Sequence, residues 1–106
     1  MKKIIAFALL CGSPLYGEET FVGFRALKPS VNLTMAQAAL ENCREAGFQI
    51  GVMVTDKFGI PQVFLRDQYA GVHVMETTHR KAWTAVTFRT ATSELSELTA
   101  AGTELA

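Results

Sequence analysis

The sequence predicts a small α+β domain, and three observations support this prediction. Residues 34–47 carry small apolar side chains at helical spacing, residues 49–66 hold two apolar runs around a Gly-containing turn, and residues 72–88 lack Gly and Pro. Apolar residues three or four apart indicate a helix, whereas short apolar runs bounded by turn residues indicate strands. The expected order is helix, β-hairpin, helix. Because two strands rarely form a stable sheet alone, we expect a sheet that is incomplete in this chain or is completed by a partner chain.

The N-terminus has the features of a secretory signal peptide. Two lysines precede the short apolar run 4–10, which is well below the roughly 20 residues that span a bilayer. Cleavage after Gly17 is favoured, and cleavage after Ser13 is the alternative. A lipoprotein signal through Cys11 is disfavoured because Leu10 stands where a small residue is required. The sequence therefore predicts a signal peptide over residues 1–17 and a periplasmic or secreted protein.

Removal of this peptide changes the charge and the cysteine count. The remaining chain carries eight basic and ten acidic residues, so no basic field is available to attract nucleic acid. Cys43 becomes the sole cysteine, which excludes an intramolecular disulfide and a two-cysteine metal site and favours a buried free thiol. Fewer than about ninety residues form one small domain. We interpret residues 18–32 as an N-terminal arm and residues 33–106 as the domain.

The first helix is expected to begin at Thr34. Thr34 and Gln37 have the spacing of a capping box, in which each side chain bonds a free backbone amide of the first turn. Gly47 is suited to the left-handed conformation that ends a helix. Between these residues runs a narrow stripe that would allow close approach to a sheet, formed by Ala36, Ala39, Leu40, Cys43 and Ala46.

The hairpin and the second helix follow directly. Residues 49–55 and 61–66 are predicted strands, joined by a turn over residues 56–59 in which Gly59 can adopt a positive φ. The helix over residues 72–88 has two distinct faces. A polar row contains His73, Glu76, Thr77, Arg80, Thr84 and Thr87, and an apolar stripe contains Met75, His79, Ala82 and Val86. The polar row is either a ligand-binding face or a surface face with a Glu76–Arg80 ion pair. A further helical turn begins near Thr92 or Ser93.

Several short motifs occur together in this order. They are Val54-Thr-Asp56 with Gly59, Leu65-Arg-Asp67, Ala70-Gly-Val-His73, Arg80-Lys-Ala-Trp-Thr-Ala85 and Thr92-Ser-Glu-Leu95. With the small-residue helix before Gly47, the pattern resembles the haem-degrading family of GlcG-like and HbpS-like proteins, and within it the exported haem-binding branch. The resemblance implies a profilin-like fold, an antiparallel sheet of about five strands flanked by helices, in a homo-oligomer that binds haem. Family members usually continue with further strands, so we expect a C-terminally incomplete domain.

Haem binding would need an apolar slot, an axial ligand and cations for two propionates. His73 is the predicted axial ligand, Arg80 and Lys81 the propionate partners, and Thr84 a weak or alternative ligand. The slot would be lined by Tyr69, Val72, Val74 and Trp83. We interpret His79 as a core or interface histidine. Glu94 and Glu97, one helical turn apart, are a candidate weak metal site.

The sequence shows no Ser/His/Asp nucleophile arrangement and no phosphate-binding glycine loop. Any enzymatic activity would therefore come from a bound cofactor that the protein orients. The leading hypothesis is an exported haem-binding protein, with slow haem breakdown or iron handling as a secondary activity. Two alternatives stay open: an exported accessory subunit that binds a small molecule other than haem, and a truncated remnant without activity.

Overall fold

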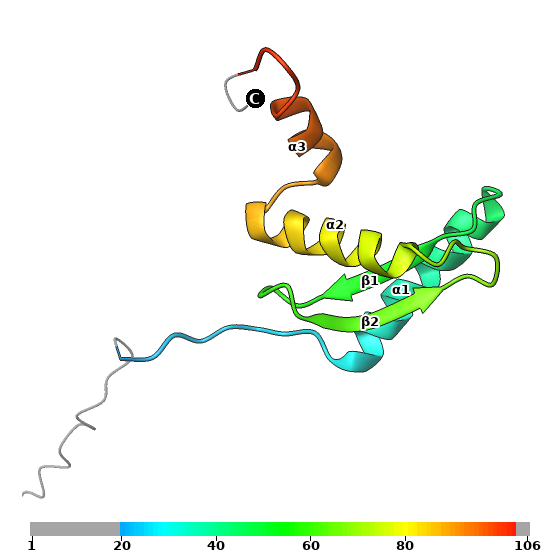
Figure 1. Cartoon of the computed structure of the whole chain (residues 1–106). Coiled ribbons are helices and arrows are strands. Elements are labelled where there is room, and N and C mark those ends of the chain that lie inside the picture. Colours follow the sequence, from blue (N-terminus) through cyan, green and yellow to red (C-terminus); the bar gives the residue numbers. More distant parts are fainter. Residues whose placement is uncertain (1–19, 104–106) are drawn as a thin grey trace, which may run out of the picture.

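The computed structural model describes residues 20–103 and shows an α+β arrangement (Figure 1). The predicted signal peptide lies outside the described residues. The elements in order are α1 (Pro29–Glu45), β1 (Gly51–Thr55), β2 (Pro61–Arg66), α2 (Val74–Phe88) and α3 (Thr92–Leu98). The predicted order of helix, hairpin and helix is confirmed.

The two strands form an antiparallel hairpin whose turn is held by one carboxylate. Gly51 pairs with Arg66 at the open end, and the register is irregular between Val54 and Thr55, next to the turn. Asp56 Oδ1 accepts hydrogen bonds from the backbone amides of Phe58 (2.8 Å) and Ile60 (3.0 Å). Gly59 adopts φ +82°, as predicted for this turn.

Helix α1 begins at Pro29, five residues before the predicted start. Proline is suited to the first helical position, because its φ is already helical and its missing N–H would have no intrahelical acceptor there. The Thr34 hydroxyl donates to the Ser30 carbonyl (3.0 Å) inside the helix, so the predicted capping box is wrong. The predicted end is confirmed: Gly47 has φ +89°, and the Phe48 amide donates to the Cys43 carbonyl (2.9 Å) in a Schellman motif.

One narrow stripe of α1 faces the hairpin. Ala36 is fully buried and Asn32 is buried, while Leu40 and Cys43 are half-buried. Cys43 is a free thiol. The predicted stripe is correct at Ala36, Leu40 and Cys43, but Ala39 and Ala46 are exposed. Small side chains in this stripe allow the helix to pack closely on the strands.

Enlarging the side chain at Ala36 tests this close packing. We expect Ala36→Leu to lower the free energy of unfolding by about 1–3 kcal/mol, because a fully buried site has no room for the added atoms. Ala38→Leu, on the exposed side of the same helix, is the matched control and is expected to change it by less than about 0.5 kcal/mol. Urea unfolding followed by circular dichroism measures both. Equal stabilities of the two variants would contradict this packing.

Helix α2 packs on the hairpin through a different stripe from the one predicted. Val74 lies directly on the backbone of Gly51, where an added β-carbon would lie only 2.8 Å from Val74 Cγ2. The half-buried residues of α2 are Val74, Thr78, Ala82, Thr84, Ala85 and Val86. Ala82 and Val86 were predicted correctly. Met75 and His79 are exposed, so their placement on the sheet-facing stripe was wrong: the Val74–Gly51 contact turns them away from the strands.

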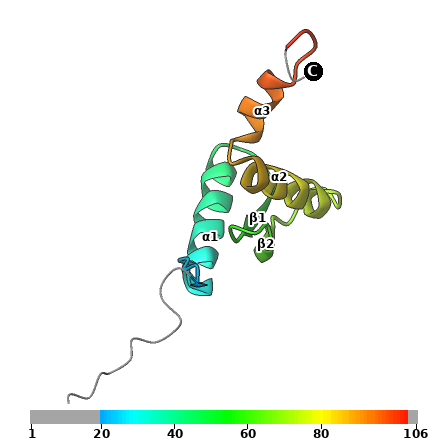
Figure 2. The ribbon, with the colours of Figure 1, turned by 90° about the vertical axis from the view of Figure 1, so that its left-hand side faces the viewer.

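The hairpin lies between α1 and α2, and α3 extends beyond α2 (Figures 1 and 2). Among the described residues, the buried apolar side chains are only Ala36 and Ala70. Large apolar side chains such as Phe48, Tyr69, Val72 and Trp83 are exposed. This two-stranded sheet therefore leaves much apolar surface uncovered, in agreement with the predicted incomplete sheet. None of the helices in residues 20–103 has the length and hydrophobicity of a membrane span.

Candidate functional site

His73 is the residue immediately before α2. Its backbone is already helical (φ −73°, ψ −14°), and its carbonyl accepts hydrogen bonds from the amide and the hydroxyl of Thr77, both at 3.1 Å. The imidazole is exposed and lies over Gly71, where a β-carbon would be 2.8 Å from His73 Nδ1. Because Gly71 has no side chain, the imidazole ring can lie against its backbone at the N-terminal end of the helix. The polar row begins at this ring.

Arg80 lies two turns further along the same face. Its guanidinium is bonded to the Glu76 carboxylate, which is the ion pair that the spacing predicted. Both side chains are largely exposed, so this pair contributes little to stability. Arg80 can therefore exchange Glu76 for the carboxylate of a bound ligand at small cost.

A shallow groove of about 410 Å³ lies on the outer surface of α2 and is lined by His79, Arg80, Trp83 and Thr84. It brings together two of the predicted ligand-binding residues, Arg80 and Thr84, with an exposed indole. The Trp83 ring also packs on the hairpin turn, because a β-carbon at Gly59 would lie 2.8 Å from Trp83 Cδ1. His79 lines this groove and is exposed, so it is not a core residue, whereas its interpretation as an interface residue stays a prediction. The rotation of α2 on the hairpin, which no local sequence signal reveals, exposes it.

Lys81 lies on another side of α2 from Arg80. Its Nζ donates to the Thr92 hydroxyl (2.8 Å), and it lines a second shallow cavity beside β1 together with Ala39 and Met53. Consecutive helical residues are separated by about 100° around the axis, so Arg80 and Lys81 face different surroundings. The proposed contact of Lys81 with a propionate stays a prediction.

The two glutamates of the candidate metal site lie in α3. Glu94 accepts a hydrogen bond from the Thr90 hydroxyl (2.8 Å) next to the start of that helix. Within residues 20–103, no group of three or more His, Cys, Asp or Glu side chains is gathered as a metal site would require. Metal binding by Glu94 and Glu97 stays a prediction.

The loop that leads to His73 is anchored by an ion pair between a buried carboxylate, Asp67, and a half-exposed guanidinium, Arg44. Asp67 is 3% exposed, and its carboxylate accepts from Arg44 Nε (3.1 Å) and Nη2 (2.9 Å) and from the Gln68 amide (3.0 Å). The Asp67 amide donates to the Ile50 carbonyl (2.9 Å). The hydrogen bonds from Arg44 lower the pKa of Asp67, although burial opposes this shift. The pair joins the end of α1 to the loop after β2, and it was missed because its partners lie 23 residues apart.

An α+β module with an imidazole, a guanidinium and an indole on one helix face has the side chains of a small-molecule-binding domain. Comparison with known families makes this more specific. Residues 27–106 match the family described as "Haem degrading protein HbpS-like", and the chain belongs to this family. The predicted resemblance is thereby confirmed, and the family gives the chain a haem-related function. No curated protein matches the sequence.

Proposed function

We propose that this chain is an exported haem-binding protein. The observation that carries the proposal is the exposed face of α2, with His73 at one end and Arg80, Trp83 and Thr84 further along, in a chain of the HbpS-like family. Haem presents an iron that accepts an axial ligand, a flat apolar ring and two propionates. The face offers a group suited to each of these parts.

His73 is the proposed axial ligand. Its imidazole is exposed and has no hydrogen-bond partner among the described residues, so a ring nitrogen is free to bind iron. Arg80, seven residues on and therefore roughly 10 Å along the helix, is the proposed propionate partner. Thr84 is the alternative oxygen ligand. Tyr69, Val72 and Trp83 are exposed as a slot would require, whereas Val74 packs on Gly51 and does not line it.

A second copy of the chain is proposed to supply the other wall of the slot. Ligand sites bury most of the surface of the molecule they hold, and one open helix face leaves a haem largely in water. The exposed apolar side chains near His73, including Tyr69 and Val72, favour such an assembly. We therefore propose a homo-oligomer with haem at a boundary between subunits.

The location and the chemistry are part of the same proposal. Export would follow from the signal peptide over residues 1–17, which places the protein in the periplasm or outside the cell. Bound haem would supply any oxidative chemistry in the presence of peroxide, while the residues of α2 bind and orient it. Slow haem breakdown is proposed as a secondary activity.

A hemin titration of the mature chain, residues 18–106, followed in the Soret band, tests the haem proposal. We expect a saturable shift whose dissociation constant rises by at least about tenfold in His73→Ala, because the axial bond is lost. The chain has two histidines, so His79→Ala, which removes the imidazole of the groove but not the proposed axial ligand, is the matched comparison and is expected to weaken hemin binding much less than His73→Ala. Circular dichroism establishes that all three proteins are folded.

The other outcomes separate the competing interpretations. An equal or larger loss of hemin affinity in His79→Ala would indicate that the axial ligand is His79, in the groove of α2, rather than His73. A folded chain without a saturable shift would favour the accessory subunit that binds a molecule other than haem. An unfolded chain would favour the remnant, an outcome consistent with the small number of buried apolar residues in the described part of the chain.

A further inference from the structure

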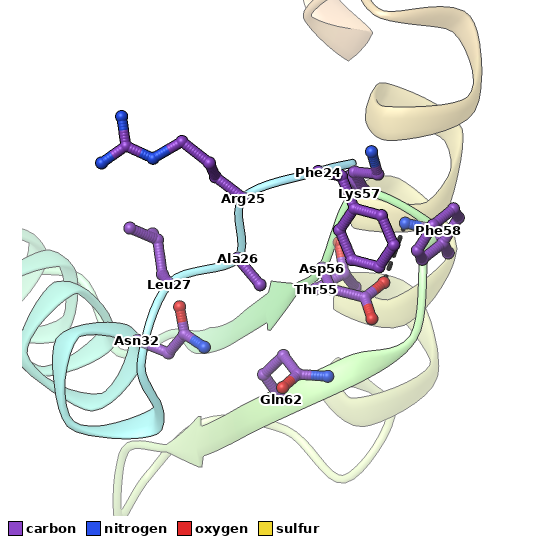
Figure 3. Close-up of a pocket in the computed structure, with 10 residues that line it drawn as sticks. All are labelled: Phe24, Arg25, Ala26, Leu27, Asn32, Thr55, Asp56, Lys57, Phe58 and Gln62. Carbon is purple, nitrogen blue, oxygen red and sulfur yellow. Dashed lines mark hydrogen bonds between the residues drawn. The ribbon is translucent and has the colours of Figure 1, made fainter. Parts of the chain in front are cut away.

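A partly enclosed cavity of about 250 Å³ lies between the N-terminal arm, the first turn of α1 and the hairpin turn (Figure 3). The arm crosses over the hairpin at Phe24 to Leu27 and forms one wall, while Thr55 to Phe58 form another. The residues of the α2 groove, where haem is proposed to bind, do not line it. The cavity is therefore a separate candidate site.

Aromatic packing fixes the arm against the turn. The rings of Phe24 and Phe58 meet edge to face, with centroids 5.3 Å apart and planes at 89°. The Lys57 ammonium lies 4.2 Å from the centroid of the Phe24 ring and 5.2 Å from that of Phe58. Edge-to-face and cation–π contacts of this kind favour one arrangement over others. The cavity thus has a defined apolar wall with a cation at its edge.

A buried amide points into this cavity. Asn32 is 4% exposed and lines the cavity, and no buried side-chain nitrogen or oxygen of residues 20–103 lacks a partner, so its amide atoms are open to the cavity rather than sealed from solvent. Figure 3 shows its amide directed into the space below the arm. Gln62, which also lines the cavity, donates only long hydrogen bonds to the carbonyls of Ile60 (3.3 Å) and Pro61 (3.4 Å). A polar ligand group in the cavity would replace water as the partner of the Asn32 amide.

The charges around the cavity favour an anion. Arg25 and Lys57 line it, and neither forms an ion pair within residues 20–103, but the Arg25 guanidinium points away from the cavity (Figure 3). Asp56 is the one acidic residue that lines it, and Asp56 Oδ1 is already bonded to two backbone amides of the turn. The lining therefore carries two positive charges against one negative charge, and Lys57 is the cation placed to meet a ligand.

We propose that this cavity binds a small organic carboxylate with a flat apolar body. The body would lie against Phe24 and Phe58, and the carboxylate would accept hydrogen bonds from the Asn32 amide and from Lys57. The cavity is smaller than the range of about 300–1,000 Å³ that holds drug-sized ligands, so the ligand is a single-ring molecule rather than a haem.

Titration of the purified chain with benzoate, followed by ¹H–¹⁵N NMR, tests the proposal. We expect saturable shifts of the Asn32 and Gln62 side-chain amides. Benzamide lacks the charge and acetate lacks the ring, so each is expected to bind at least about tenfold more weakly. Benzylamine, which carries the opposite charge, is expected not to bind there. Benzylamine binding as tightly as benzoate, or benzoate failing to saturate, would overturn the proposal.

Substitutions test whether benzoate binds in this cavity. Asn32→Leu removes the buried amide and Lys57→Gln removes a rim cation, and each is expected to raise the dissociation constant of benzoate by about tenfold. Arg89→Gln removes the same charge outside the cavity and is expected to leave it unchanged. Lys57 is exposed, so Lys57→Gln keeps the test informative if Asn32→Leu fails to fold. Unchanged benzoate affinity in Lys57→Gln would refute the site, whatever the result of the hemin titration.

Discussion

Replacing Gly59 with alanine is expected to lower the free energy of unfolding by about 2–5 kcal/mol. Two costs combine at this residue. Its φ of +82° is unfavourable for any residue with a β-carbon, and that β-carbon would lie 2.8 Å from Trp83 Cδ1 and 3.6 Å from Val86 Cγ1. Urea unfolding followed by circular dichroism measures the loss. The fluorescence of Trp83, the one tryptophan of the chain, reports the displacement of its indole.

Gly47→Ala separates the two costs. Gly47 has a similar φ of +89°, but an added β-carbon there would meet nothing within 4 Å. This variant is expected to lose only the backbone component, about 1–2 kcal/mol, and to keep the fluorescence of Trp83. Equal losses in Gly47→Ala and Gly59→Ala would show that the indole does not pack on the turn. Since Trp83 lines the groove of α2, that result would also alter the proposed haem face.

Arg44→Met is expected to lower the thermal midpoint well below that of the unsubstituted chain at neutral pH. The substitution leaves the Asp67 carboxylate, whose side chain is 2% exposed, without its cation. Arg80→Met is the matched control, because it breaks an ion pair whose two side chains are 77% and 70% exposed. It is expected to change the midpoint little. A similar fall in both variants would contradict a special role for the Arg44–Asp67 pair.

The dependence on pH provides an independent test of the same pair. The hydrogen bonds from Arg44 lower the pKa of Asp67 in the folded chain, so this carboxylate stabilises the fold above its unfolded pKa of about 3.9. That stabilisation is lost as the pH falls through the lower, folded pKa. In Arg44→Met the buried carboxyl favours its protonated form instead, so the difference between the two midpoints is expected to shrink on acidification. A difference that is constant between pH 7 and pH 3 would contradict this account.

The sequence by itself determined the features that depend on neighbouring residues. The hairpin turn at residues 56–59, the end of α1 at Gly47 and the strand Pro61–Arg66 lie where they were predicted. The helical period also placed Arg80 and Thr84 on one face of α2, after His73. These features are set by backbone conformation and by hydrogen bonds within a few residues, so a local sequence pattern is sufficient to predict them. The short motifs were also sufficient to identify the family, because their order and spacing are read directly from the sequence.

Only the tertiary structure decided which surfaces meet. The contact of Val74 with Gly51 rotates α2 so that Met75 and His79 face outward. The pair of Arg44 with Asp67 and the packing of Phe24 on Phe58 join residues far apart in the chain. A helix can pack on a sheet in several rotations about its own axis, each of which buries a different set of side chains. The close packing of Val74 on Gly51 selects one of these rotations. Long-range packing of this kind leaves no periodic signal in the sequence, and it therefore became visible only in the folded chain.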